Sequence, residues 1–185
     1  MRTSVPLRHA NRILNHGPVV LVTSASGGRD NLMPAAWVMP LDFEPALVAA
    51  VIAAGTFTRE LVDASGELGL SVPPASFLDA VHAAGQVTGR EVDKWARFGL
   101  ARAPASRIAA PLVDGCLAWL ECRVVERSLA ERHDLFVCEV LSAWADDRAF
   151  HGGEWHFDDP EGRTFHNVVG NRYFLTGEAR IVKED

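Results

Sequence analysis

Apolar residues fall into short runs along the chain, and these runs predict β-strands separated by turns and helices. Residues 18–25 and 46–54 are rich in Val, Leu and Ile and are bounded by Gly and Pro, a pattern typical of strands buried on both faces. Residues 31–40 form another extended segment, which carries Pro34 and Pro40. Because proline cannot donate a ladder hydrogen bond, we expect this segment at a sheet edge or a bulge, with free backbone groups.

Apolar residues at helical spacing predict helices between the extended segments. One helix is bounded by Thr56, which suits an N-cap, and by Gly66, which suits a left-handed C-terminal cap. Shorter helical patterns occupy residues 7–14, 75–84 and 93–98. The last of these lies in a charged loop punctuated by glycines.

The second half of the chain changes to longer extended segments. Residues 67–72 predict a strand, and residues 115–126 and 135–145 predict an antiparallel pair joined by a polar hairpin connection. Roughly six or seven strands with inserted helices favour a mainly β fold, a closed or split antiparallel barrel, over alternating parallel units.

Composition narrows the class of protein. With 185 residues and 48% apolar content, residues 1–185 are expected to form a single domain. The net charge of -6 and the scattered basic residues argue against nucleic acid and membrane as partners. Cys116, Cys122 and Cys138 lie in apolar segments and favour a reducing cytoplasm. We find no targeting segment, and the longest apolar run, residues 46–55, is too short to cross a bilayer.

Five stretches, in this order and spacing, resemble a known family. They are residues 6–15, 18–59, 67–73, 89–98 and 132–140. The chain resembles the flavin reductase-like, FMN-binding split-barrel proteins, and in particular their flavoredoxin-like branch. This resemblance implies a Greek-key antiparallel split β-barrel, FMN as cofactor, and a homodimer with FMN at the subunit interface.

The resemblance also implies a set of FMN contacts. Trp37 is expected against the isoalloxazine ring, with the backbone of residues 34–38 at the ring edge. The phosphate and ribityl hydroxyls are expected near the helix start, and a lysine and a histidine beside the flavin. The expected cofactor-binding residues are Met33, Pro34, Ala35, Ala36, Trp37, Val38, Met39, Thr56, Thr58, Arg59, Lys94 and His133.

The residues alone leave other interpretations open. Trp37 and Met39 also suit a hydrophobic core, and Lys94 also suits a solvated surface. A helix start that carries Thr58 and Arg59 is either an ordinary capped terminus or an anion site.

The histidines leave further possibilities open. His133, beside an aspartate in a polar turn, is either a functional or a solvated histidine. A metal site formed by His151, His156 and His166 is a further possibility, but their spacing matches no established ligand pattern, and we expect no metal.

Three functions are compatible with these features. The first is an NAD(P)H:flavin oxidoreductase, in which NAD(P)H delivers hydride to the flavin without a catalytic acid or base of the protein. The second is a flavoredoxin-type electron carrier that holds FMN tightly and receives electrons from a partner protein. The third is a flavin-binding fold used for storage or another reductive step. The sequence contains no dinucleotide fingerprint that would choose between NADH and NADPH.

Overall fold

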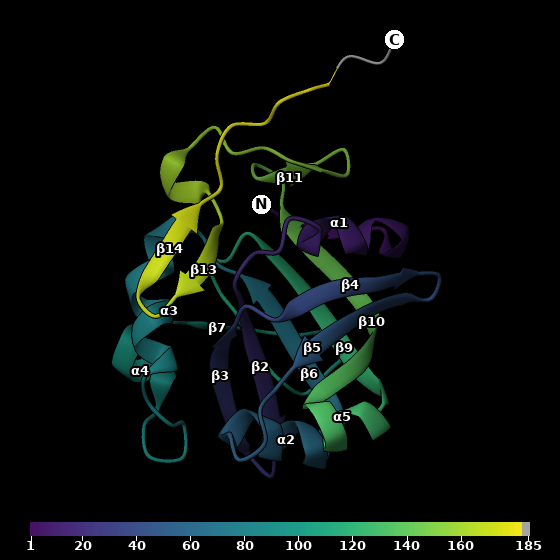
Figure 1. Ribbon diagram of the computed structural model, residues 1–185, viewed down its shortest axis with the longest axis vertical. Helices are drawn as coiled ribbons and strands as arrows, with labels where there is room; N and C mark the ends of the chain where they lie inside the picture. The colour runs from purple at the N-terminus through teal and green to yellow at the C-terminus, as the bar shows by residue number, and fades with distance from the viewer. Residues whose placement is uncertain (183–185) are drawn as a thin grey trace.

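One large antiparallel sheet organises the computed structural model, which describes residues 1–182 (Figure 1). Its strands follow the spatial order β3-β2-β6-β9-β10-β5-β4, and β1 pairs with β10. Their bounds are β1 Arg2–Val5, β2 Val20–Ser26, β3 Arg29–Ala35, β4 Val38–Phe43, β5 Ala46–Val51, β6 Glu67–Val72, β9 Ala118–Glu126 and β10 Leu135–Asp146. The path therefore ends at β3 on one side and at β4 on the other, and these two edges bound the opening of a split barrel.

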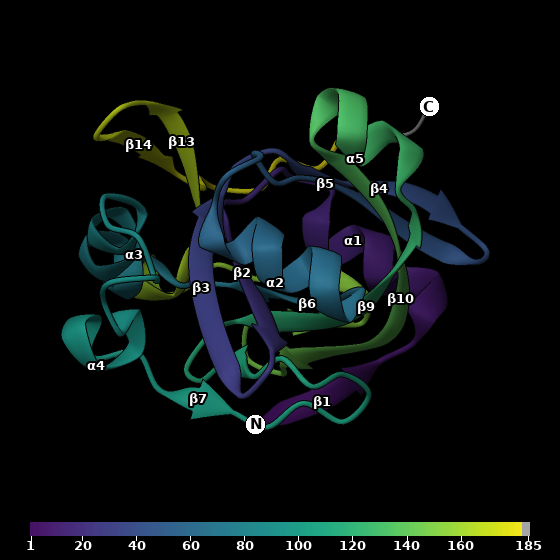
Figure 2. The ribbon, with the colours of Figure 1, turned by 90° about the horizontal axis from the view of Figure 1, so that it is seen from below.

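Helices close the end of the barrel and cover its side. Figure 2 shows α2 (Phe57–Ser65) lying across the end of the barrel, with α1 (Ala10–Leu14) behind it. Outside β3 lie α3 (Leu78–Gly85) and α4 (Lys94–Phe98), while α5 (Ser128–His133) connects β9 to β10. No helix in residues 1–182 is long and apolar enough to span a membrane.

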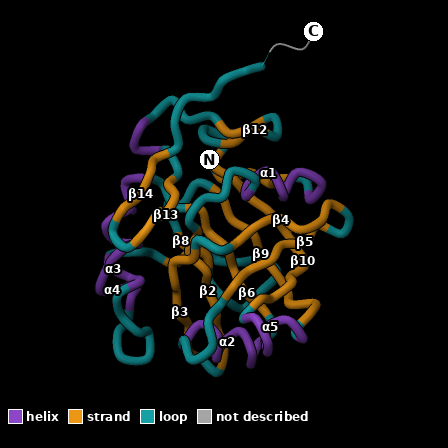
Figure 3. Tube along the Cα trace, in the orientation of Figure 1, coloured by secondary structure: helices purple, strands orange, loops and turns teal. Residues whose placement is uncertain are grey.

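Short elements complete the fold, as the tube in Figure 3 shows. Three two-stranded sheets pair β7 with β8, β11 with β12, and β13 with β14. Their strands and the three 3-10 helices are β7 Arg102–Ala103, β8 Leu112–Val113, β11 Phe150–His151, β12 Glu154–Trp155, β13 Phe165–Val169, β14 Arg172–Leu175, η1 Leu7–His9, η2 Ala75–Phe77 and η3 Pro160–Gly162.

Apolar side chains form two clusters, and β2 contributes to both. Val20 and Val22 belong to the cluster inside the barrel, which also contains Phe136. Leu21 points the other way, into a second cluster with Leu32 of β3 and helical residues of α3 and α4. Because alternate residues of a strand face opposite sides, this double burial explains the unbroken apolar run that predicted β2.

The predicted mainly β architecture with inserted helices is confirmed. Thr56 caps α2 by accepting from the Arg59 N–H at 3.2 Å, and Gly66 adopts the left-handed C-cap with φ of 72°. All three cysteines are buried and free.

Three local predictions were wrong or incomplete. Residues 31–40 are not one segment but parts of β3 and β4, both at sheet edges as the prolines required. The connection between β9 and β10 contains α5 rather than a plain hairpin turn. The sequence pattern also did not reveal β1 or the short C-terminal hairpins, because pairs this short depend on the rest of the fold.

A buried carboxylate ties the N-terminal strand and the loop before β8 to the sheet. Glu121 of β9 accepts the backbone N–H groups of Ser106 and Arg107 at 2.9 and 2.6 Å. Its other oxygen accepts the Ser106 hydroxyl and the Trp144 indole N–H. The Arg2 guanidinium lies 3.8 Å away. Burial would raise the pKa of Glu121, but these hydrogen bonds, the one from Arg107 first, hold that pKa below its ordinary value of 4.5.

We expect Glu121→Gln to lower the free energy of unfolding by about 1–3 kcal/mol at neutral pH, because Gln cannot accept from every donor. A pKa lowered by folding stabilises the protein above the unfolded value of 4.5, and this contribution is lost as the pH falls through the folded value. Urea denaturation at neutral and acidic pH measures both effects. A difference between wild type and Glu121→Gln that does not shrink in acid would contradict this role.

Candidate functional site

A cavity of about 460 Å³ lies where the edge strand β3, the start of α2 and the loop between α3 and α4 meet. Its walls combine polar and apolar side chains, the two cations Arg90 and Lys94, and the carboxylate of Glu91. The lining residues are Asn31, Met33, Gly55, Thr56, Phe57, Thr58, Gly85, Gln86, Val87, Thr88, Gly89, Arg90, Glu91 and Lys94.

The start of α2 forms one wall of the cavity. The Thr56 hydroxyl donates to the Ala53 carbonyl at 2.9 Å and accepts from the Arg59 N–H at 3.2 Å. This hydroxyl is therefore committed to capping the helix. Helical N–H groups of the first turn have no partner within the helix and carry a partial positive charge. The capped terminus thus presents a surface that favours an anionic group.

A buried hydrogen bond fixes the side chain of Thr58, the second residue of α2, in this wall. Asn31 of β3 is 4% exposed, and its side-chain N–H donates to the Thr58 hydroxyl at 2.8 Å. Thr58 is itself only 1% exposed, and its hydroxyl proton has no acceptor among the described residues. A Cβ at Gly89 would overlap the Asn31 side chain, so glycine lets the loop approach β3 this closely.

Lys94 supplies a buried cation to the same cavity. It is the first residue of α4, whose N-cap Asp93 accepts the N–H groups of Trp95 and Ala96 at 3.0 and 3.3 Å. Lys94 is 5% exposed, and it has no ion-pair partner within residues 1–182. Burial lowers the pKa of Lys94 to about 8. A buried ammonium without a counter-ion is costly, and an anionic ligand would offset that cost.

A second cavity of about 250 Å³ adjoins the first and shares Gly85 and Gln86 with it. Pro34, Ala35 and Ala36, at the end of β3, line this second cavity. Its far wall consists of His82 and residues of the β13–β14 hairpin. The two cavities together follow β3 from Asn31 to Ala36, which suits a ligand with an anionic end and a less polar end.

The structure brings together seven of the twelve predicted site residues. Met33, Thr56, Thr58 and Lys94 line the first cavity. Pro34, Ala35 and Ala36 line the second. The other five residues line neither cavity: Trp37, Val38, Met39, Arg59 and His133.

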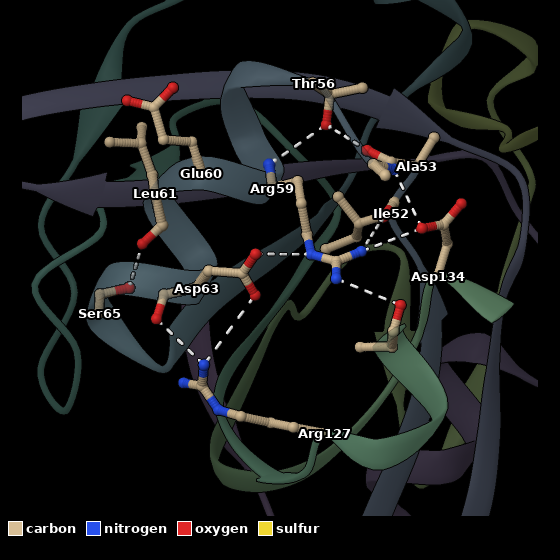
Figure 4. Close-up of polar contacts among 12 residues, drawn as sticks. Ile52, Ala53, Thr56, Arg59, Glu60, Leu61, Asp63, Ser65, Arg127 and Asp134 are labelled. Carbon is tan, nitrogen blue, oxygen red and sulfur yellow. Dashed lines mark hydrogen bonds and ion pairs between the residues drawn. The ribbon is translucent and has the colours of Figure 1, made fainter. Parts of the chain in front are cut away.

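Arg59 is turned away from the cavity. Figure 4 shows its guanidinium directed toward Ile52, Asp63 and Asp134 instead. It therefore holds protein groups, and the structure does not support the predicted Arg59 phosphate contact.

The remaining four residues lie on other surfaces or in the core. Val38 is buried in the barrel, while Trp37 and Met39 are 75% and 56% exposed on the single chain. His133 is exposed at the end of α5. Trp37, Met39 and His133 are thus exposed on the surface of the single chain, and their predicted contacts with FMN stay predictions.

Sequence reasoning missed Asn31 and Gly89 as site residues. The signal for Asn31 was a polar residue two positions before Met33, on the same face of β3. Gly89 gave no such signal, because its close approach to Asn31 depends on the tertiary fold.

The three cysteines, His151 and His156 line neither of the two cavities. Burial raises the pKa of Cys138 to about 12 and those of Cys116 and Cys122 well above their ordinary value. Such thiols are not reactive at neutral pH. His151 and His156 stack face to face at 3.6 Å, and the described residues contain no group of three or more ligands that could hold a metal ion.

Comparison with known proteins identifies the family. The sequence model described as "Flavin reductase like domain" matches residues 13–159, and the chain belongs to this family. The uncharacterized protein YddH of Escherichia coli K12 is 40% identical over 178 residues, which cover 94% of each chain. The resemblance predicted from the sequence is thus confirmed.

Solved structures share the fold. An FMN-binding domain of a flavin reductases-like enzyme from Shewanella baltica OS155 superposes with a TM-score of 0.95 and 36% identity, covering 99% of this chain and 98% of that one. Flavoredoxin of Desulfovibrio vulgaris (Miyazaki F) superposes with a TM-score of 0.79 over 90% of each chain. At 23% identity, the flavoredoxin supports the fold alone.

Proposed function

We propose that this protein binds FMN along β3 and transfers hydride from NAD(P)H to flavin. The observation that carries the proposal is Lys94, a buried cation without a partner, which opens into the same cavity as Thr58 and the start of α2. The likeness to the FMN-binding Shewanella baltica domain supports the choice of ligand. The residues present fit FMN, because its phosphate would supply the anion that Lys94 lacks.

The first cavity suits the phosphate. A phosphate monoester carries between one and two negative charges at neutral pH and offers several acceptor oxygens. Lys94 would donate from its ammonium, and Thr58 would donate its hydroxyl proton. Thr56 would act indirectly, because it keeps the helix start in place. Charge-assisted bonds of this kind are about twice as strong as neutral ones.

The second cavity suits the ring. Pro34 interrupts hydrogen bonding at the edge of the sheet, and small side chains at Ala35 and Ala36 let a flat ligand approach the backbone. When bound, FMN would supply the redox chemistry, because its ring accepts the hydride from NAD(P)H. The protein would supply binding, orientation and a place for the nicotinamide beside the ring, and no acid or base of the chain is required.

The pH dependence of binding tests the assignment of Lys94. Phosphate favours the charged ammonium, so FMN affinity should be full below pH 8 and fall as the pH rises through the Lys94 pKa of about 8. Riboflavin, which lacks the phosphate, should bind with little pH dependence. Fluorescence titrations of both ligands measure this contrast.

The matched variant is Lys94→Met, which keeps the length of the side chain and removes its charge. It should abolish the decline of FMN affinity above pH 8. If Lys94→Met weakens FMN and riboflavin equally, the lysine faces the ring rather than the phosphate.

The hydride step is tested by anaerobic reduction. Adding NADH or NADPH to the FMN-loaded protein should bleach the visible absorption of the oxidised flavin, at a rate that saturates with nucleotide concentration. Free FMN at the same concentration is the control. Persistent colour with both nucleotides, followed by bleaching with a chemical reductant, would instead favour a flavoredoxin-type carrier that takes electrons from a partner protein.

The exposed face of β4 supports a homodimer as part of this proposal. Four large apolar side chains are exposed on this edge strand and at its start: Trp37 is 75% exposed, Met39 56%, Leu41 49% and Phe43 67%. Trp37 and Met39 share one face by strand alternation, and a register irregularity between Pro40 and Asp42 breaks that alternation at Leu41, so the four side chains form an apolar row along the edge of β4 but not a single face. A second copy packed by two-fold symmetry would cover the row and place Trp37 beside an FMN site.

We expect light scattering to give a mass of about twice 20.1 kDa for the wild type. Met39→Lys should shift the protein to monomer, because it puts a charge in the row. Val125→Lys is the matched control, since Val125 is 50% exposed on β9, away from β4. A wild-type monomer with FMN bound would contradict the dimer.

A further inference from the structure

We propose that Arg59 and Asp134 are positioning residues, which set flavin affinity by holding the segment 52–56 against the α5–β10 corner. This inference rests on the proposed function, because segment 52–56 leads into the cavity wall at Gly55 and Thr56. It assigns Arg59 a role different from a phosphate contact. The two residues would act on the ligand only through the backbone that they hold.

Arg59 is almost entirely used by protein groups. Its side chain is 13% exposed and pairs with Asp63 at 2.8 Å and with Asp134 at 3.1 Å. It also donates to the carbonyls of Ile52 and Ala130, each at 3.2 Å. The guanidinium carbon lies 4.8 Å from the centre of the Phe136 ring. A cation with these contacts on several sides is not available to a ligand (Figure 4).

Asp134 holds the same segment from the other side. Its carboxylate accepts the Ala54 N–H at 3.0 Å as well as the Arg59 guanidinium, and its carbonyl accepts the Ile52 N–H at 2.8 Å. Asp134 has a φ of 59° and is the one non-glycine residue with positive φ within residues 1–182. Residues other than glycine rarely adopt this backbone conformation, and it persists where the surrounding structure holds it in place.

The geometry links these contacts to the cavity. Ile52 and Ala54 are fixed by Arg59 and Asp134, while the next residue, Gly55, lines the cavity. Thr56 then caps α2 by bonding to Ala53 and Arg59. Loss of the contacts of either the Arg59 or the Asp134 side chain would therefore loosen both the cavity wall and the start of α2, without removing any atom that contacts the ligand.

The chain contains a matched control contact between the same two regions. Arg127, at the N-cap of α5, donates to the Asp63 carbonyl at 3.0 Å, near the other end of α2. This contact also joins α5 to α2, and it shares Asp63 with Arg59, but Arg127 itself does not touch segment 52–56. Arg127→Ala therefore reports what general loosening of the α2–α5 contact does.

The experiment compares FMN and riboflavin affinities of five proteins by fluorescence titration: wild type, Arg59→Ala, Asp134→Gly, the double variant and Arg127→Ala. Glycine at 134 keeps the left-handed backbone and removes only the carboxylate. We expect each single variant to weaken both ligands by about tenfold and by the same factor, and the double variant to be little weaker than either single one. Arg127→Ala should bind like wild type.

Amide hydrogen exchange of the flavin-free proteins provides a second readout. Exchange at residues 52–56 should accelerate in Arg59→Ala and Asp134→Gly but not in Arg127→Ala. Should Arg59→Ala fail to fold, Asp134→Gly carries the same comparison.

Three outcomes would overturn the inference. Arg59→Ala that weakens FMN but not riboflavin would indicate a direct phosphate contact. Unchanged flavin affinity in both single variants, or an equal loss of affinity in Arg127→Ala, would show that the contacts of Arg59 and Asp134 have no special role in binding. A wild-type protein that binds no flavin would overturn the proposed function itself, a result distinct from these.

Discussion

Backbone pairing along β10 is the constraint on which the rest of the structure depends. This strand of 12 residues pairs with β5 at its start, with β9 along most of its length and with β1 at its end. Two register irregularities, between Val137 and Cys138 and between Val140 and Ser142, accompany its pairing with β9. Such bulges bend and twist a strand, which helps a sheet close into a barrel. Asp134, which fixes segment 52–56, directly precedes this strand.

The candidate site adds a charge that the fold alone does not explain. Lys94 is buried and lacks a carboxylate partner among the described residues, although the protein as a whole has a net charge of -6. A structural role would be served better by an apolar side chain of similar length. The cost of burying the Lys94 ammonium without a counter-ion is explained at a ligand site, where an anionic ligand supplies the counter-ion. The adjacent Asn31–Thr58 bond, made possible by Gly89, keeps the neighbouring donor in place.

Local signals in the sequence predicted much of the fold. The strands β2, β5, β6, β9 and β10 were predicted correctly. Burial on both faces leaves a continuous apolar pattern in β2 and most of β5, whereas β10 alternates between buried and partly exposed residues. The caps of α2 at Thr56 and Gly66 were correct because capping depends on a few neighbouring residues. The break between β3 and β4 was missed, since no glycine marks the turn at Ala36 and Trp37.

The site was predictable only in part, because side-chain direction depends on distant residues. Thr58 and Lys94 were predicted and share a cavity, although they are 36 residues apart (94 minus 58). Arg59 was expected at the phosphate, but its partner Asp134 lies 75 residues along the chain and turns the guanidinium away. Neither helical periodicity nor residue type could reveal that partner. Asn31 likewise gains its role only from contact with Thr58 and Gly89.

A structure of the protein determined with FMN added would show directly where the flavin binds. We predict flavin density along β3, with the phosphate within hydrogen-bond distance of the Lys94 ammonium and the Thr58 hydroxyl, and the ring beside residues 34–36. Density for the phosphate against the Arg59 guanidinium, or flavin bound at the separate cavity lined by Arg148 and His156, would contradict it.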